Sequence, residues 1–296
     1  MPSVRDLRDR IRSLKNTQQI TKAMKQVAAA KIRRAEAARK RARPYADALG
    51  EMLADLIGAV STVDHPFMKP GRVGAPAGIV LVSADKGLAG AFNSNVIHAA
   101  ELFARGQGAV VYYTVGTKAR NAVRRMGMPG DASWPLGGDS KLDTARAVAV
   151  AATSDFESGK ISEIVLVSQR LVSMMSQRPQ TRKLVPILAG DVAGPAEGES
   201  RALPGAQPRG AVEFAPSPEF VLSRLLPKYL EFTIYSAMLE TDAAFFAAQL
   251  VAMTNATDNA SKLIDELTIV MNNARQAAIT KELLEIVAGA EALGVE

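Results

Sequence analysis

The sequence predicts an α/β protein with a long antiparallel coiled coil, in which the N- and C-terminal helices pair and a central α/β domain lies between them in the chain. Three observations predict this fold. Gly and Pro are sparse at both ends of the chain, and each end carries an apolar stripe at helical spacing. The middle instead alternates short β-branched runs with helical stretches, which is typical of a parallel sheet.

Residues 1–60 are predicted to form the first coiled-coil helix. The chain has neither Gly nor Pro between Ser3 and Arg43, and the residues there favour helix. Steps of three and four from Val4 to Val60 land on an apolar residue at thirteen of seventeen positions, so one face forms a coiled-coil seam. A helix over this segment is about 85 Å long at 1.5 Å per residue.

The seam is interrupted near its middle by polar residues. Gln18, Thr21 and Lys25 fall on the stripe, whereas three apolar residues lie beside it. These apolar residues are Ile20, Met24 and Val27. We therefore expect the buried face of the helix to shift toward them in this region.

Residues 217–296 are predicted to form the second coiled-coil helix. Ser217 is a candidate N-cap, Pro218 occupies the first helical position, and no Gly follows until Gly289. Apolar residues recur at helical spacing, and a helix of some 70 residues runs on the order of 100 Å. Each end of the chain thus has an apolar stripe that needs a partner, and an antiparallel pair made from the two ends covers both.

Residues 75–190 have a different period and are predicted to form a Rossmann-like parallel α/β domain. Short apolar, β-branched runs alternate with helical stretches, as in a sheet covered by helices. The runs are residues 78–83, 109–115 and 161–167, and the helical stretches are residues 91–105, 117–126 and 142–158. Residues 191–216 are rich in Gly and Pro, so we expect an irregular loop before the second long helix.

Composition excludes several kinds of site. The chain has no Cys, and His65 and His98 are too far apart in sequence for a histidine-rich metal site. We expect no metal, no cofactor and no catalytic residue. No stretch of about 18 uncharged apolar residues is present. The N-terminus lacks the apolar core of a secretory signal, so we expect the protein to work where it is made.

The positive charge of the chain is concentrated at its N-terminal end. The formal net charge is +6, and residues 1–43 hold 14 Lys and Arg against three acids, so the rest of the chain is net negative. One interpretation is an ordinary solvated helix face. The other is an anionic partner: nucleic acid, a lipid surface or an acidic protein. The absence of aromatic residues from this segment weighs against base stacking.

The loop Asp85–Gly90 follows the first predicted strand and precedes a helix, which is where doubly wound sheets often bind phosphate. Its glycines match neither the dinucleotide-binding spacing nor the P-loop spacing, so a tight structural turn is the favoured interpretation. A nucleotide-using enzyme is the alternative that this loop leaves open.

Two features of the C-terminal helix indicate a partner. Arg275 and Gln276 lie side by side among small residues, and an Arg can hold a carboxylate with two parallel hydrogen bonds. The alternative is an arginine whose stem merely lies along the helix. Residues 283–290 are mostly apolar although they lie near the chain terminus, so either another protein covers them or the helix end frays.

Two terminal segments carry specific motifs. Residues 8–31 read RDRIRSLKNTQQITKAMKQVAAAK, and residues 256–290 contain ATDNA followed by ARQAAITKELLEIVAGA. With these motifs and the DKGLAG loop, the sequence closely resembles the gamma chain of F-type ATP synthases over essentially its whole length.

The resemblance implies a rotor shaft. In that family the paired terminal helices stand inside a hexamer of three alpha and three beta subunits, and the α/β domain sits on the membrane c-ring beside an epsilon subunit. Rotation couples proton flow to ATP synthesis or hydrolysis by setting the conformations of the beta subunits. The resemblance also implies a bacterial protein, peripheral on the cytoplasmic side of the inner membrane and attached to it only through the complex.

The same resemblance assigns roles to residues of the second helix. Arg275 and Gln276 are expected to engage an acidic loop of one beta subunit. Thr280 and Glu282 match positions that matter to coupling in the family.

On the first helix, the resemblance implies that Lys22, Met24 and Lys25 pass acidic helical tips of other beta subunits. The alternative function is a basic coiled-coil protein that binds nucleic acid. That alternative explains the basic arm but gives the α/β domain and the apolar tip no role.

Overall fold

A computed structural model of the chain describes residues 3–59, 65–128, 130–137, 140–187, 215 and 217–293. The elements are α1 (Val4–Ala59), η1 (Pro66–Met68), β1 (Ala77–Val82), α2 (Phe92–Arg105), β2 (Val110–Val115), α3 (Thr117–Arg125), β3 (Gly130–Trp134), α4 (Lys141–Glu157), β4 (Glu163–Ser173), β5 (Ser176–Val185) and α5 (Pro218–Leu293). By their contacts these residues form two compact units. The described residues within 1–28 and 249–296 make the first unit, and those within 29–248 make the second.

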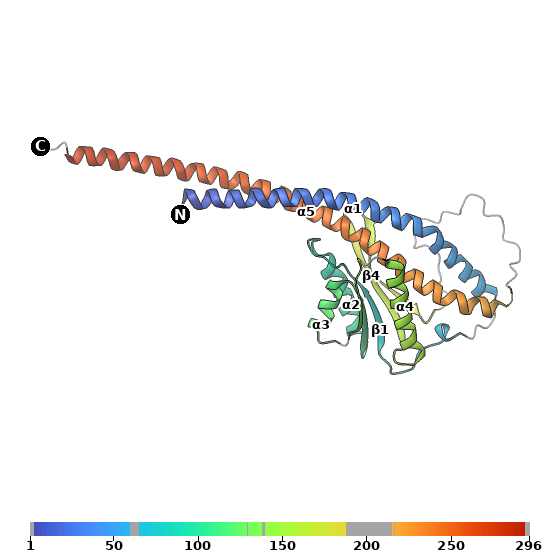
Figure 1. Ribbon diagram of the computed structural model, residues 1–296. Helices are drawn as coiled ribbons and strands as arrows, with labels where there is room; N and C mark the ends of the chain where they lie inside the picture. Colours follow the sequence, from blue (N-terminus) through green and yellow to red (C-terminus); the bar gives the residue numbers. More distant parts are fainter. Residues whose placement is uncertain are drawn as a thin grey trace. The chain divides into compact units, whose positions relative to one another are not determined.

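The first unit is an antiparallel pair of helices made from the beginning of α1 and the end of α5 (Figure 1). Gln18 Nε2 donates to Ser261 Oγ at 2.6 Å, and Thr257 Oγ1 donates to Thr21 Oγ1 at 2.9 Å. Because the position on α5 falls as the position on α1 rises, the two helices run in opposite directions. The predicted pairing of the two chain ends is therefore confirmed.

The seam of this pair follows the predicted steps of three and four residues. Buried residues of α1 in this unit are Leu7, Ile11, Thr21 and Ala28, and those of α5 are Gln249, Met253, Ala260 and Ile264. The expected shift of the buried face is wrong. Ile20 and Val27 are 61% and 53% exposed, whereas Thr21 is only 8% exposed.

A polar layer, made of Gln18 and Thr21 of α1 with Thr257 and Ser261 of α5, stays in the seam because its side chains are hydrogen-bonded. Besides the two contacts between the helices, Thr257 Oγ1 lies 2.7 Å from the Met253 carbonyl and Ser261 Oγ lies 3.2 Å from the Thr257 carbonyl. A buried hydroxyl costs little once it is hydrogen-bonded. The helix therefore keeps one straight seam and leaves Ile20 in solvent.

The second unit contains a five-stranded sheet of order β3-β2-β1-β4-β5. The first four strands of this order are parallel, and β5 pairs antiparallel with β4. The three predicted strands are β1, β2 and β4, and the three predicted helical stretches are α2, α3 and α4. The sequence interpretation missed the two edge strands, β3 and β5, and β5 makes the sheet mixed instead of wholly parallel.

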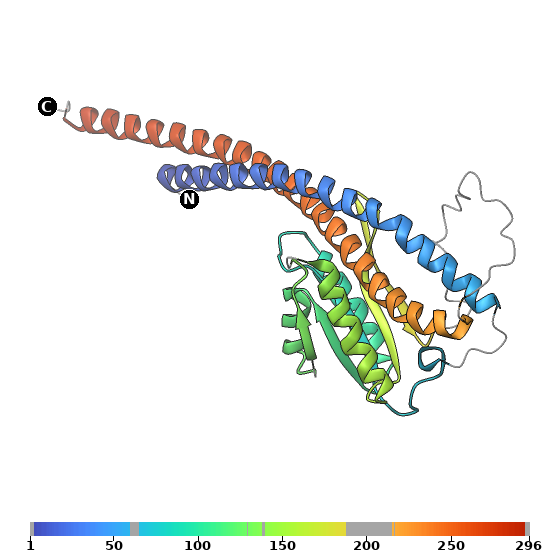
Figure 2. The same cartoon turned by 45° about the vertical axis from the view of Figure 1, so that its right-hand side comes forward.

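Helices cover both faces of the sheet. On one face, α2 and α3 pack on side chains that include Ile79, Leu81 and Tyr112. On the other face, Val80, Val82 and Val111 pack with α4 and with segments of α1 and α5 (Figure 2). The alternation of neighbouring strand residues between two apolar cores explains why the strands read as continuous apolar runs.

The N-cap predicted for the second long helix is confirmed. The Phe220 backbone N–H donates to Ser217 Oγ at 3.2 Å, and α5 begins at Pro218. The loop predicted over residues 191–216 lies outside the described residues except for Ala215. The division of the chain at residues 60, 75, 190 and 217 stays a prediction.

Candidate functional site

Near its end, α5 has a long run of residues that are exposed to solvent. From Arg275 to Gly289 every residue is exposed. The register of the pair explains this, because Thr21 lies opposite Thr257 and α1 begins at Val4. By this register, α5 passes the first turn of α1 beyond about residue 274, and Figure 2 shows the end of α5 extending past the start of α1. The large apolar side chains exposed there are Ile279, Leu283, Leu284, Ile286 and Val287.

Four of the predicted contact residues lie on this exposed end. Arg275 makes no ion pair or hydrogen bond through its side chain with any described residue. Thr280 Oγ1 donates to the Gln276 carbonyl at 3.0 Å, which is a bond inside the helix. Glu282 is exposed as well. The Arg275 guanidinium is therefore available to an acceptor on another chain.

The three residues predicted on α1 lie elsewhere along the helix pair. Lys22 is exposed, and Met24 and Lys25 are half-buried. They follow Thr21, which contacts Thr257, and Arg275 lies about 27 Å further along α5 at 1.5 Å per residue. The structure therefore places the predicted contact residues in two separate groups.

The loop after β1 is held by the Asp85 carboxylate. Its Oδ1 accepts from the Thr117 backbone N–H at 2.8 Å and from Thr117 Oγ1 at 2.9 Å, and its Oδ2 accepts from the Gly137 backbone N–H at 2.8 Å. Burial acts to raise the pKa of Asp85, but these hydrogen bonds outweigh it and hold the pKa below 3.8. Asp85 thus ties together the loops that follow β1, β2 and β3.

The phosphate position of a doubly wound sheet is occupied here by the chain itself. The first amides of α3 donate to Asp85, to the Ala84 carbonyl at 3.2 Å and to Ser83 Oγ at 2.7 Å. Gly116 precedes this helix with φ +96°, and a Cβ there would lie 2.2 Å from the Ser83 carbonyl oxygen. These contacts favour the structural interpretation of the Asp85–Gly90 loop over the nucleotide-binding one.

Replacing Asp85 by Ala is expected to lower the free energy of unfolding by about 1–3 kcal/mol, because two backbone donors lose their acceptor. The contribution of Asp85 to the free energy of unfolding is fully present above pH 3.8, the ordinary pKa of Asp. It is lost as the pH falls through the lower pKa that Asp85 has in the folded state. Urea unfolding of the isolated chain measures it. Lys86→Ala, at the exposed next position, is the control. Equal unfolding midpoints for the Asp85 variant and wild type at neutral pH would contradict the assignment.

A second candidate region is the part of α5 that meets the α/β domain, called here the domain-contact segment (Tyr229, Glu231, Glu240, Thr241 and Asp242). Each of these polar side chains has a partner on the domain. Tyr229 accepts from Arg182 at 2.7 Å, Thr241 Oγ1 accepts from the Gln169 backbone N–H at 3.4 Å, and Glu240 accepts from the Leu171 backbone N–H at 3.2 Å. The β4–β5 hairpin thus contacts α5 through specific hydrogen bonds as well as apolar packing.

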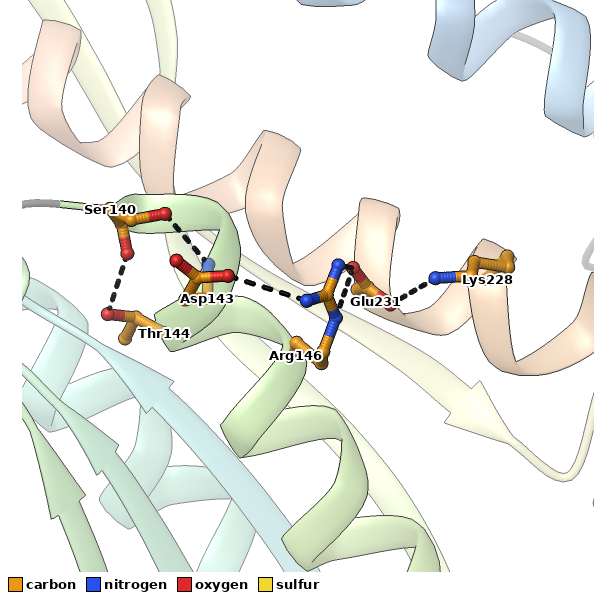
Figure 3. A network of polar contacts seen from close by, with 6 residues as sticks. All are labelled: Ser140, Asp143, Thr144, Arg146, Lys228 and Glu231. Atoms are coloured by element: carbon orange, nitrogen blue, oxygen red, sulfur yellow. Dashed lines mark hydrogen bonds and ion pairs between the residues drawn. The ribbon is translucent and has the colours of Figure 1, made fainter.

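Helix α4 meets the domain-contact segment through ion pairs, and Figure 3 shows the one between Arg146 and Glu231. The Arg146 guanidinium contacts Glu231 Oε1 through Nε at 3.2 Å and Nη2 at 3.1 Å, while Lys228 Nζ lies 3.1 Å from Oε2. Lys141 Nζ lies 3.2 Å from Asp242 Oδ2. Ser140 caps α4 by accepting from the Asp143 backbone N–H.

The sequence interpretation missed the domain-contact segment. Glu231 stands between Leu230 and Phe232 in an otherwise apolar stretch, and its residue is 8% exposed. A carboxylate in an apolar helical run is a signal that a cation lies opposite, because a buried charge needs a partner. The sequence could not identify that cation as Arg146, because Arg146 is 85 positions from Glu231 in the chain.

The position of Glu240 disfavours the charged form of its carboxyl group. Burial raises its pKa above 4.5, and the raising effect outweighs the Leu171 hydrogen bond and the nearby Arg39 and Arg170 guanidinium groups, which lower it. A carboxyl whose folded-state pKa is raised contributes stability below its unfolded-state pKa. That contribution is lost as the pH rises through the folded-state pKa.

Glu240→Gln is therefore expected to stabilise the chain at neutral pH, because it removes the buried charge and keeps an oxygen for the Leu171 N–H. Below pH 4.5 the variant and wild type should unfold alike. Urea midpoints at the two pH values measure the difference. Glu266→Gln, an exposed site on the same helix, should show no such pH dependence. A variant that is less stable at neutral pH would overturn this account.

The pairing of the two chain ends, the α/β domain inserted between them and the exposed helix end define the class of proteins with a long antiparallel coiled coil and an inserted α/β domain. The family model described as ATP synthase matches residues 3–293, and the chain belongs to this family. Full-length relatives narrow the assignment to one subunit. The chain is 43% identical over 295 residues to the ATP synthase gamma chain of Heliobacterium modesticaldum, covering 99% of this chain and 100% of that one.

Other relatives and solved structures agree. The ATP synthase gamma chain of Acidiphilium cryptum is 43% identical over 303 residues, covering 99% of this chain and 100% of that one. A chain in the Euglena gracilis mitochondrial ATP synthase superposes with a TM-score of 0.67 at 18% identity, covering 98% of this chain and 94% of that one. A chain in the rotor of the same enzyme gives 0.62 at 17% identity, covering 93% and 98%. At such low identities these two likenesses show the fold alone.

Proposed function

We propose that this chain is the central-stalk rotor subunit of an F-type ATP synthase and that the exposed end of α5 is where it meets the catalytic subunits. Full-length identity of 43% to ATP synthase gamma chains supports the subunit assignment. The single observation that supports the contact site is the helix over residues 275–289, which has no partner within the described chain. Neither the relatives nor the fold supports the nucleic-acid-binding alternative.

A single helix offers different chemistry on different sides. At 100° per residue, Arg275 and Glu282 share one face, while Gln276 and Thr280 share another, about 120° further round. Three identical beta subunits placed around such a helix meet different side chains at the same moment. Contacts that differ between subunits can hold them in different states, and turning the helix exchanges those states.

The chemistry of each contact follows from its side chains. Arg275 presents a planar fork of donors that fits a carboxylate on an acidic loop of a beta subunit. Lys22 and Lys25 on α1 are positioned to pass acidic helical tips of neighbouring beta subunits, with Met24 between them. The exposed apolar group at Leu283, Leu284 and Ile286 fits an apolar collar in the hexamer, where contacts without direction permit rotation.

The remaining partners follow from the same assignment. They are the alpha subunits of the hexamer, the epsilon subunit and the membrane c-ring, and the chain itself carries no catalytic residue in this proposal. None of the described helices combines the length and apolarity needed to cross a bilayer. Attachment to a bacterial inner membrane, on its cytoplasmic side, is therefore proposed to run through the complex.

Arg275→Ala tests the contact site. The variant should lower ATP turnover of the assembled complex by about tenfold or more, because charge-assisted hydrogen bonds contribute roughly 1.5–3 kcal/mol. The isolated chain should unfold at the wild-type urea concentration, since the Arg275 side chain is exposed and makes no hydrogen bond or ion pair with the described residues. Lys262→Ala removes an exposed cation from the paired part of α5 and should leave turnover unchanged. Wild-type turnover of the Arg275 variant would remove this residue from the mechanism.

A further inference from the structure

Two ion pairs join α4 to α5 and are called here the α4–α5 ion pairs (Arg146–Glu231 and Lys141–Asp242). They lie at 3.1 Å and 3.2 Å between the nearest nitrogen and oxygen atoms. Both belong to the second unit, so each joins groups that are packed in one compact body. Their partners on α4 are in its first two turns.

The two pairs hold α5 at separate points along its axis. Glu231 and Asp242 are eleven residues apart, close to three full turns, so they lie on the same face about 16 Å apart along the helix. A single contact would allow α4 to pivot about it. Two contacts at this separation resist sliding along α5 and rotation around it at the same time.

The Arg146–Glu231 pair is the more constrained of the two. The Glu231 side chain is 11% exposed and receives cations on both oxygens, Arg146 on one and Lys228 on the other. Asp143 Oδ1 lies 3.4 Å from Arg146 Nη1 and orients the guanidinium toward α5 (Figure 3). The guanidinium is thus fixed from two sides.

The apolar core between the domain and α5 lacks this directionality. It includes Leu222, Leu226, Leu230 and Ile234 of α5, all nearly inaccessible to solvent. Apolar contact stabilises in proportion to buried area but is non-directional, so neighbouring registers of similar shape differ little in energy. Paired charges distinguish between registers because a shift by one turn separates them.

We infer that the α4–α5 ion pairs fix the register of the α/β domain on α5 and keep the domain from slipping when load passes between them. Lys141, Arg146, Glu231 and Asp242 are thus positioning residues for rotary coupling. This inference rests on the proposed rotor function. It concerns load within the chain and not the contacts of the chain with other subunits.

The test measures coupling in the membrane-bound complex. Lys141→Asp and Asp242→Lys each break the Lys141–Asp242 pair. The double variant restores this pair with the two charges exchanged. Asp in the first turn of α4 also suits the helix N-terminus, so Lys141→Asp does not weaken α4 itself. Each variant complex is reconstituted in vesicles, and ATP hydrolysis and ATP-driven proton uptake are recorded on the same sample.

Each single variant should lower protons moved per ATP hydrolysed by about twofold or more, while hydrolysis in the absence of a proton gradient persists. The double variant should return this ratio to the wild-type value. Lys183→Gln is the control, because it breaks an ion pair with Glu163 between β4 and β5 that does not involve α5.

If the ion pair only stabilises the fold, the single variants should unfold at lower urea, but the complexes that assemble should move the wild-type number of protons per ATP hydrolysed. An unchanged ratio in the single variants, or no recovery in the double variant, would overturn the inference. Failure of the wild-type chain to assemble into a complex that hydrolyses ATP and takes up protons would instead refute the proposed function. The two failures are therefore distinguishable.

Discussion

Burial of the apolar seam of α1 against α5 is the constraint on which the other features depend. Leu7 and Ile11 are buried near the start of the chain, and Ile264 is buried near its end, so each stripe removes the other from water. Because the two stripes lie at opposite ends of the sequence, this contact closes the chain on itself. The sheet is then a domain inserted between two partners that must meet.

Helix α5 changes its chemical surroundings along its length. Residues near Leu226 and Leu230 lie in the apolar core of the α/β domain, and residues from Tyr229 to Asp242 add polar contacts to that domain. Further along, Thr257 and Ser261 contact α1. Beyond Arg275 the helix has no partner among the described residues. One continuous helix therefore first packs on the α/β domain, then pairs with α1 in the coiled coil, and then presents an exposed surface.

Periodicity predicted the long elements well, because each repeats its apolar signal many times. The same reasoning failed at the polar layer, where the local pattern of apolar residues predicted that Ile20 would be buried in place of Thr21. Hydrogen bonds to Thr257 and Ser261 reversed that preference, and such partners cannot be seen in a one-dimensional pattern. The edge strands were missed for a related reason. β5 carries Pro179 and several cations, and an edge strand needs only one buried side.

The candidate contact residues were predictable only in part. Exposure of Arg275 and Gln276 follows from the register of the pair, whereas the contact roles proposed for them rest on the resemblance to the gamma chain family. The domain-contact segment could not be predicted, because Lys141 and Asp242 are far apart in the sequence and only the fold brings them together.

The antiparallel register of the chain ends can be measured directly because the chain has no cysteine. Thr21→Cys and Thr257→Cys replace two hydroxyl groups whose oxygens lie 2.9 Å apart. Under mild oxidation the double variant should form an intramolecular disulfide in nearly every molecule, whereas Thr21→Cys with Ile269→Cys, which lies about 18 Å further along α5, should not. Efficient cross-linking of the distant pair, with none between positions 21 and 257, would contradict the pairing on which this account rests.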